Sequence, residues 1–283
     1  MKQNRSVRAL LSQTFVGMGL VALVVPGLGL KSASHASRST PVVSASIDNT
    51  VPIAQLPSPI QLQVPPPDLQ KKVAAPRSTF TGKEIQYFME VAMGSEYGAE
   101  LTPRIHKWSG DVRIQYTGRP TAEDLRTLQS IVREINSLTY NQIRLQLVTS
   151  NPNLTVRFVP ESQFARFEPA YVPINYGFFT TQWDANNRIY RANVLITTTG
   201  VTQKERSHLI REELTQSLGL MRDSYRYASS MFYQPWTDVT QYAEIDKALI
   251  RMLYSPQIQP GMTQAQVLNA FKSPQSAQTP LRF

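Results

Sequence analysis

The sequence predicts one folded domain of mixed α/β (α+β) class, spanning residues 79–271 of the 283-residue chain. Segments with apolar residues at helical spacing are separated by shorter segments in which apolar and polar residues alternate one by one. Two of the helical segments, 121–138 and 203–218, are long, and several strands lie between them. This order predicts a twisted mixed sheet packed against two long helices.

The first half of the domain contains two predicted helices. One is expected to begin at Thr81, because Glu84 follows three residues later, as in a capping box. The second opens at Thr121 and carries apolar residues along one face as far as Leu138. Alternation of apolar and polar residues predicts strands over five ranges along the domain, which are 112–116, 143–147, 154–158, 178–183 and about 190–197.

Turn and cap residues set the limits of the later elements. The ranges 151–153 and 184–187 are rich in residues that favour turns. Thr202 and Glu205 form a further capping box, and Gly219 suits the left-handed conformation that ends many helices. The second long helix is therefore expected to lie between them.

Residues 1–36 have the order of a secretory signal, with a basic start, an apolar stretch and small residues at the end. Ser34 and Ala36 suit the −3 and −1 positions of a cleavage site. The apolar stretch is short for a membrane span and is interrupted by Pro and Gly. We therefore expect an exported protein, periplasmic or extracellular, without a transmembrane segment after signal removal. An uncleaved membrane anchor is the alternative.

Residues 37–78 contain eight of the 20 Pro residues of the chain and no lasting apolar period. This composition is typical of an extended, disordered linker. The linker either holds the folded domain at a distance from a membrane or wall, or is an extension without a partner. The tail, 272–283, is also expected to be disordered.

Composition excludes several classes of function. The chain has no Cys, which excludes disulfides, thiolate metal sites and a cysteine nucleophile, and its three His are too few for a dense imidazole cluster. The formal charge of +9 falls to +5 without residues 1–36, because 25 basic and 20 acidic residues remain. These basic residues are scattered and not interleaved with aromatic residues, so nucleic acid is not expected as a partner.

The second long helix carries a pattern related to metal chemistry. Its residues E-E-L-T-Q-S-L-G align with the metallopeptidase motif H-E-x-x-H-x-x-G through Gly219. In this register Glu212 and Gln216 occupy the two His positions, and Glu213 occupies the position of the general base. Residues four apart lie on one face of a helix, where both can reach one ion.

The chain thus resembles the zincin-like metallopeptidases, with both imidazoles replaced. The chain resembles a narrower group more closely, the bacterial family called domain of unknown function 2927 (DUF2927). This resemblance covers about 80–263. It is carried by three segments, which are I-R-E-E-L-T-Q-S-L-G-L-M-R-D-S, S-S-M-F-Y and L-Y-S-P-Q-I-Q-P-G-M-T. The resemblance implies an exported bacterial protein with a zincin-like domain and no established activity. It also implies a loop like the methionine turn at 230–233, with Met231 beneath the former metal site, and a C-terminal helix over 246–254.

Several positions depart from the peptidase pattern. Carried over residue by residue, only Glu213, Gly219 and Met231 are retained. The third metzincin ligand falls at Arg222, whose positive charge repels a metal ion, and Asp223 stands one position away. Alternatively, Arg211 and Arg222 form a buried ion network with the acidic residues.

His208 lies one helical turn before Glu212, so that His208, Glu212 and Gln216 form one stripe along the helix. This stripe either shares an ion or contains a simple His–Glu hydrogen bond. One imidazole, one carboxylate and one amide make a poor zinc site. The expectation is therefore a domain without metal or other cofactor, with a different divalent ion as the alternative.

Two weaker candidates lie near this helix. Tyr233 is either a donor to a substrate oxyanion or a buried tyrosine with a structural hydrogen bond. The aromatic residues at positions 171, 176, 178, 179 and 183 accompany a predicted strand. In the fold that the chain resembles, the edge strand of this region pairs with extended peptide; ordinary strand packing is the alternative.

Three functions are open at this point. The first is a non-catalytic module that binds a peptide, a protein or an envelope polymer in the former cleft. The second is an active hydrolase that uses Glu213 as general base with an unusual metal site, although a carboxylate alone does not polarise a peptide carbonyl strongly. The third is a structural or assembly module of the cell envelope.

Overall fold

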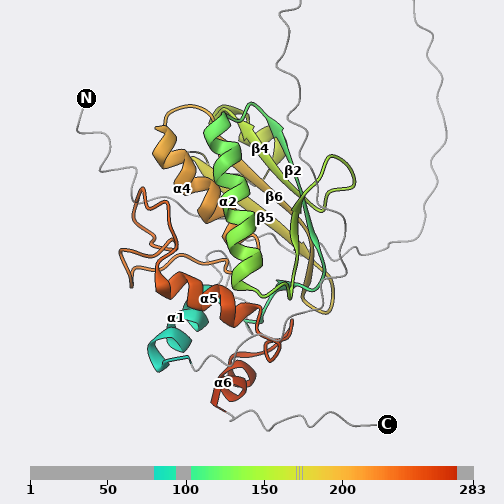
Figure 1. Cartoon of the computed structure of the whole chain (residues 1–283), viewed down its shortest axis with the longest axis vertical. Helices are drawn as coiled ribbons and strands as arrows, with labels where there is room; N and C mark the ends of the chain where they lie inside the picture. The colour runs from blue at the N-terminus through green and yellow to red at the C-terminus, as the bar shows by residue number, and fades with distance from the viewer. Residues whose placement is uncertain (1–79, 94–102, 170, 172, 174, 273–283) are drawn as a thin grey trace, which may run out of the picture. The chain divides into compact units, whose positions relative to one another are not determined.

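The computed structural model describes residues 80–93, 103–169, 171, 173 and 175–272 (Figure 1). The predictions for residues 1–36, 37–78 and 273–283 lie outside these ranges. Lys272, which was expected to begin a disordered tail, is instead the last residue of the helix Gln264–Lys272. The described elements follow in the order α1 (Gly82–Ala92), β1 (Lys107–Trp108), β2 (Val112–Gly118), α2 (Ala122–Leu138), β3 (Leu145–Leu147), β4 (Leu154–Val159), η2 (Glu161–Gln163), α3 (Phe164–Phe167), β5 (Gly177–Trp183), β6 (Arg188–Thr197), α4 (Gln203–Gln216), α5 (Glu244–Leu253) and α6 (Gln264–Lys272).

The six described strands form one mixed sheet. The order across it is β1-β6-β4-β2-β3, and β5 pairs with β6. All of these pairings are parallel except that of β5 with β6, which is antiparallel and turns at 184–187. Asn187 has a φ of 61° at this turn, in the left-handed region that Asn tolerates better than most residues. The predicted mixed sheet is therefore confirmed, and it is mostly parallel.

The two long helices α2 and α4 lie side by side and cover one face of the sheet (Figure 1). The predicted apolar stripe of α2 is buried, with Leu128, Ile131 and Ile135 at 0% exposure. These side chains belong to the same core as the inward residues of the strands, among them Ile114 and Val194. Burying this apolar surface is the main favourable contribution to folding of the domain.

The opposite face of the sheet is covered only in part by the described residues. Successive residues of a strand point to opposite faces, so Phe178 and Leu195 point away from the main core, while Phe179 and Val194 point into it. A small second cluster forms there from Val159, Phe164, Tyr171, Phe178 and Leu195, with Phe167 packed against it. The rest of this face is polar.

Some elements differ from the prediction. The short elements β1, η2 and α3 were not expected, and α6 follows the helix that was expected to be the last. The second long helix ends at Gln216, two residues earlier than predicted, with Ser217 as its C-cap. Gly219 has a φ of 119°, and a β-carbon there would lie 2.2 Å from the carbonyl oxygen of His106, so only glycine fits.

Within the described ranges, every helix is too short or too polar to cross a membrane.

Candidate functional site

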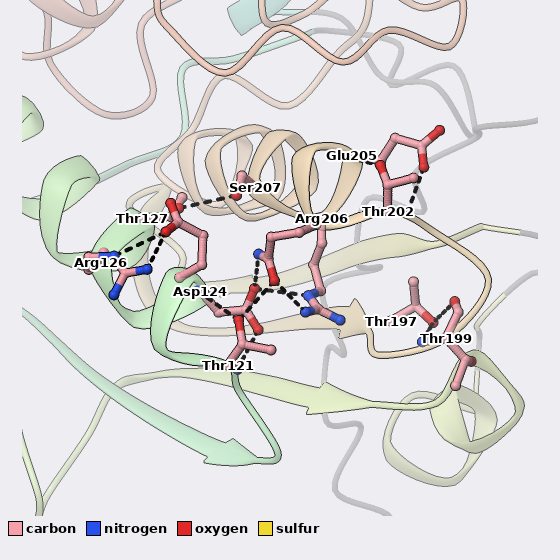
Figure 2. Close-up of polar contacts among 12 residues, drawn as sticks. Thr121, Asp124, Arg126, Thr127, Thr197, Thr199, Thr202, Glu205, Arg206 and Ser207 are labelled. Carbon is pink, nitrogen blue, oxygen red and sulfur yellow. Dashed lines mark hydrogen bonds and ion pairs between the residues drawn. The ribbon is translucent and has the colours of Figure 1, made fainter.

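The helix α4 carries most of the candidate residues, and its N-terminal end is fixed by a buried carboxylate. Asp124, in the first turn of α2, is fully buried and accepts hydrogen bonds from Arg206 Nε at 2.8 Å and Gln203 Nε2 at 2.7 Å (Figure 2). Its second oxygen accepts from the backbone N–H of Thr121 at 2.7 Å. One side chain therefore caps α2 and holds the first turn of α4 beside it.

Glu213, the candidate general base, faces the first residue of β5. The residue is 5% exposed. A β-carbon at position 177 would lie 2.4 Å from Glu213 Oε1 and 2.8 Å from its Cγ, so Gly177 leaves the space that this side chain fills. The general-base position of the motif is thus packed closely against the strand.

Gln216 and Asp223 are joined directly. Gln216 Nε2 donates a hydrogen bond to Asp223 Oδ1 at 2.5 Å, and both residues are buried. Gln216 Oε1 is also buried and makes no hydrogen bond to another described residue. The next residue, Ser224, donates its backbone N–H to Phe232 O at 2.8 Å. The end of α4 is therefore connected, through Asp223, to the loop at 230–233.

His208 is held between its own helix and a later loop. Its Nε2 lies 3.2 Å from Glu212 Oε2, and its Nδ1 lies 2.6 Å from the carbonyl oxygen of Val239. Burial alone lowers the pKa of His208, but Glu212 and the Val239 carbonyl outweigh it, so that the pKa is raised above its usual value. Both ring nitrogens therefore have partners within the protein, and one of these is the glutamate four residues later on the same helix.

The loop at 230–233 is anchored by a second buried carboxylate. Asp246 of α5 accepts from Ser230 Oγ at 2.5 Å and from the backbone N–H of Met231 at 3.0 Å and Ala243 at 2.9 Å. Ser230 Oγ also lies 2.7 Å from Tyr87 OH on α1. Met231 itself is fully buried in the main core. Asp246 therefore holds both ends of the segment 231–243 against α5.

The remaining predicted residues make other contacts. Arg222 is exposed, and its backbone N–H donates to Val91 O of α1. Tyr233 is half-buried and forms a backbone bridge with Ser224. Arg211 points the other way, toward α2, where it pairs with Glu134 at 2.7 Å. Arg211 and Arg222 thus do not share one buried ion network.

Tyr176, one of the aromatic residues that the sequence singled out, pairs with Trp236, which no sequence pattern indicated. Tyr176 and Trp236 meet edge to face with ring centroids 5.9 Å apart. Tyr176 directly precedes Gly177, which contacts Glu213, and Trp236 lies three residues before Val239, whose carbonyl oxygen contacts His208. Trp236 is 39% exposed, an unusual degree for a tryptophan. Its exposure is set by tertiary structure, and the sequence contains no pattern that reports it.

The other aromatic residues of this region are mainly structural. Phe178 and Phe179 are fully buried on opposite faces of β5. Trp183 stacks on His106 with centroids 4.1 Å apart, and burial lowers the pKa of His106 to about 4. The carbonyl oxygen of His106 lies against Gly219, beyond the C-terminal end of α4.

The residues at the metal positions of the motif do not fit a zinc ion. Gln216 presents its N–H to Asp223, and Glu212 presents one oxygen to His208. Zinc requires three or four convergent nitrogen, sulfur or carboxylate donors in tetrahedral geometry. No three His, Asp or Glu side chains within the described part of the chain are grouped closely enough to hold an ion.

Comparison with known proteins identifies a family and distant structural neighbours. The family of proteins of unknown function DUF2927 matches residues 83–273. No curated protein sequence matches the chain significantly. Among solved structures, two of myroilysin are similar at 11% and 13% identity, with TM-scores of 0.36 and 0.33. They cover 52% and 53% of this chain and 85% and 82% of myroilysin. Likeness at this level says nothing about what the chain binds or does.

Proposed function

The chain belongs to the DUF2927 family of proteins of unknown function, and we propose that its folded part is a non-catalytic binding domain of zincin-like form in an exported bacterial protein. The proposed ligand is an extended peptide segment, carried by a protein or by an envelope polymer. It lies where the cleft of a peptidase of this form would lie, between α4, β5 and the loop at 230–239.

The single observation that supports binding over hydrolysis is the pairing of Gln216 with Asp223. Together with the contact of His208 to Glu212, it places the side chains at the metal positions in hydrogen bonds with the protein itself. Side chains that are engaged in this way are not available to hold the Lewis acid that would polarise a peptide carbonyl for attack assisted by Glu213.

The edge of β5 supports a peptide as ligand. Among the described strands, β5 pairs with β6 alone. A strand edge offers main-chain donors and acceptors to which an extended peptide adds as a further strand. The exposed ring of Trp236, beside Tyr176 at the start of β5, gives such a peptide an aromatic contact for a side chain.

Binding of the full chain to an array of random extended peptides tests this proposal. We expect a set of binders whose affinity falls about tenfold or more in Trp236→Ala, as is usual when a central aromatic contact is lost. Tyr116→Ala is the matched control, because Tyr116 is 42% exposed on β2, across the sheet from β5.

Three results would contradict the proposal. No peptide binds, or Trp236→Ala changes only stability or assembly, as a structural module would require. Alternatively, the purified chain contains stoichiometric metal and cleaves peptides in a reaction that Glu213→Gln abolishes, which would establish the hydrolase instead.

A further inference from the structure

The polar face of the sheet, on the side away from α2 and α4, has an ordered arrangement of side chains. Strand register places four uncharged polar residues side by side across four strands. We call them the polar row; they are Gln115, Thr155, Asn193 and Thr180. At the usual spacing of strands the row extends over about 14 Å. All four residues are half-buried, and none belongs to either apolar cluster.

The polar row has unused capacity for hydrogen bonding. Asn193 Nδ2 and Thr180 Oγ1 both donate to Glu168 Oε1 at 2.8 Å, and Gln115 Nε2 donates to Thr149 O at 3.0 Å. These contacts fix the orientation of the two amides. Their oxygens and the hydroxyl of Thr155 make no hydrogen bond to other described residues. The row therefore presents acceptors as well as a hydroxyl that both donates and accepts.

Guanidinium groups flank the polar row on both sides. The preceding positions on the same face hold Arg113 on β2 and Arg191 on β6, and the following position on β4 holds Arg157. Arg157 is supported by the ring of Phe167, 5.0 Å away, and by Thr117. Glu168 is the one carboxylate that contacts the row among the described side chains. The face is thus net positive, and it attracts an anion.

We propose that this sheet face is a binding surface for an acidic polysaccharide, separate from the peptide site proposed at β5 and Trp236. The hydroxyls of a glycan supply donors to the amide oxygens of Gln115 and Asn193 and acceptors to Thr155. Its carboxylates pair with Arg157 and Arg191, since guanidinium and carboxylate groups match in a two-pronged geometry. The direction of the polar row, across the strands, places these contacts along one extended chain.

The same chemistry disfavours a nucleic acid. A phosphate backbone offers acceptors only, so the amide oxygens of the row would lose water without gaining a donor. Binding of single strands also depends on aromatic rings on which bases stack. The residues of the polar row and its flanking positions 113, 157 and 191 include no aromatic side chain.

The test uses the full chain and an oligogalacturonate as probe, with its fully methyl-esterified form as the neutral equivalent. We expect the charged probe to bind and the ester to bind at least tenfold more weakly. Arg157→Gln with Arg191→Gln should lower affinity about tenfold or more, and Thr155→Val about threefold to tenfold, the usual loss for a hydrogen bond. Trp236→Ala should leave the affinity unchanged.

The control is the pair Arg126→Gln and Arg133→Gln, which removes the same charge from exposed positions of α2. A thermal melt of each variant checks that it is folded. Four results would overturn the proposal. The control pair loses as much affinity as the pair at 157 and 191, or the pair at 157 and 191 loses none. Alternatively, the ester binds as tightly as the charged probe, or neither binds. Tighter binding of single-stranded DNA that the 157 and 191 pair abolishes would also overturn it, in favour of a nucleic-acid surface.

Discussion

Glu213 fits against the backbone of Gly177 so closely that a β-carbon at position 177 would lie within 2.9 Å of three atoms of its side chain. The contact joins the candidate general-base position on α4 to the first residue of β5. Glycine at position 177 is therefore a packing requirement that is specific to the carboxylate opposite it.

We expect Gly177→Ala to destabilise the domain by about 1–3 kcal/mol, the usual cost of overpacking a buried site. In a Glu213→Ala background the same substitution should cost much less, because the side chain that it meets is absent. Urea unfolding of the four proteins of this cycle measures the coupling. Additive losses would mean that the two residues do not share the contact.

The contact of His208 with Glu212 makes stability depend on pH. Because the folded pKa of His208 is raised above 6.5, its contribution is fully present below pH 6.5 and is lost as pH rises through the folded pKa. The unfolding free energy of the wild type, relative to His208→Gln, should therefore fall as the pH rises above 6.5. Urea unfolding across this range checks it; parallel curves for the two proteins would contradict the raised pKa.

The titration of His106 should change the stability of the domain in the opposite direction, and over a lower pH range. Its folded pKa of about 4 lies below the usual 6.5, so the unfolded chain takes up the proton first as pH falls. His106→Phe keeps a ring against Trp183 and removes the titration. We expect the wild type to lose about 2 kcal/mol relative to this variant between pH 6.5 and pH 4. Unfolding curves that stay at a constant separation would refute the assignment.

Two arginines on adjacent helices provide a matched test of burial. Arg206 pairs with fully buried Asp124 (Figure 2), whereas Arg126 pairs with Glu123 in a contact whose side chains are 66% and 46% exposed. Arg206→Ala leaves a buried carboxylate without its charged partner and should cost about 3–5 kcal/mol. Arg126→Ala should cost less than about 1 kcal/mol. Equal losses, measured by urea unfolding, would mean that Asp124 does not depend on Arg206.

Local signals predicted most of the elements. The capping boxes at Thr81 and Thr202 are both present, and the strands and helices that carried clear apolar periods formed where they were expected. The helix α6 was missed, although Thr263 and Gln266 hold the spacing of a capping box and exchange hydrogen bonds. Its nine residues are too few to show a clear helical period of apolar residues.

The site could be predicted only in part, because its contacts join distant parts of the sequence. The spacing of His208 and Glu212 indicated their contact, since both lie on one helix. Nothing local to Asp223 or Gly177 reports that they lie against Gln216 and Glu213. The contacts of Asp246 with both ends of a loop depend on how α5 packs against the rest of the domain. Sequence periodicity indicates only which face of α5 is buried, so it does not predict these contacts.

Both ends of the segment 231–243 are hydrogen-bonded to Asp246. This arrangement affects how the protein can evolve. When both ends of a segment are fixed, adding residues between them costs little, about 0.6 kcal/mol for each doubling of its length. Insertions around Trp236 would thus leave α4, β5 and α5 in place. New specificities can arise here by variation of one segment on a constant framework.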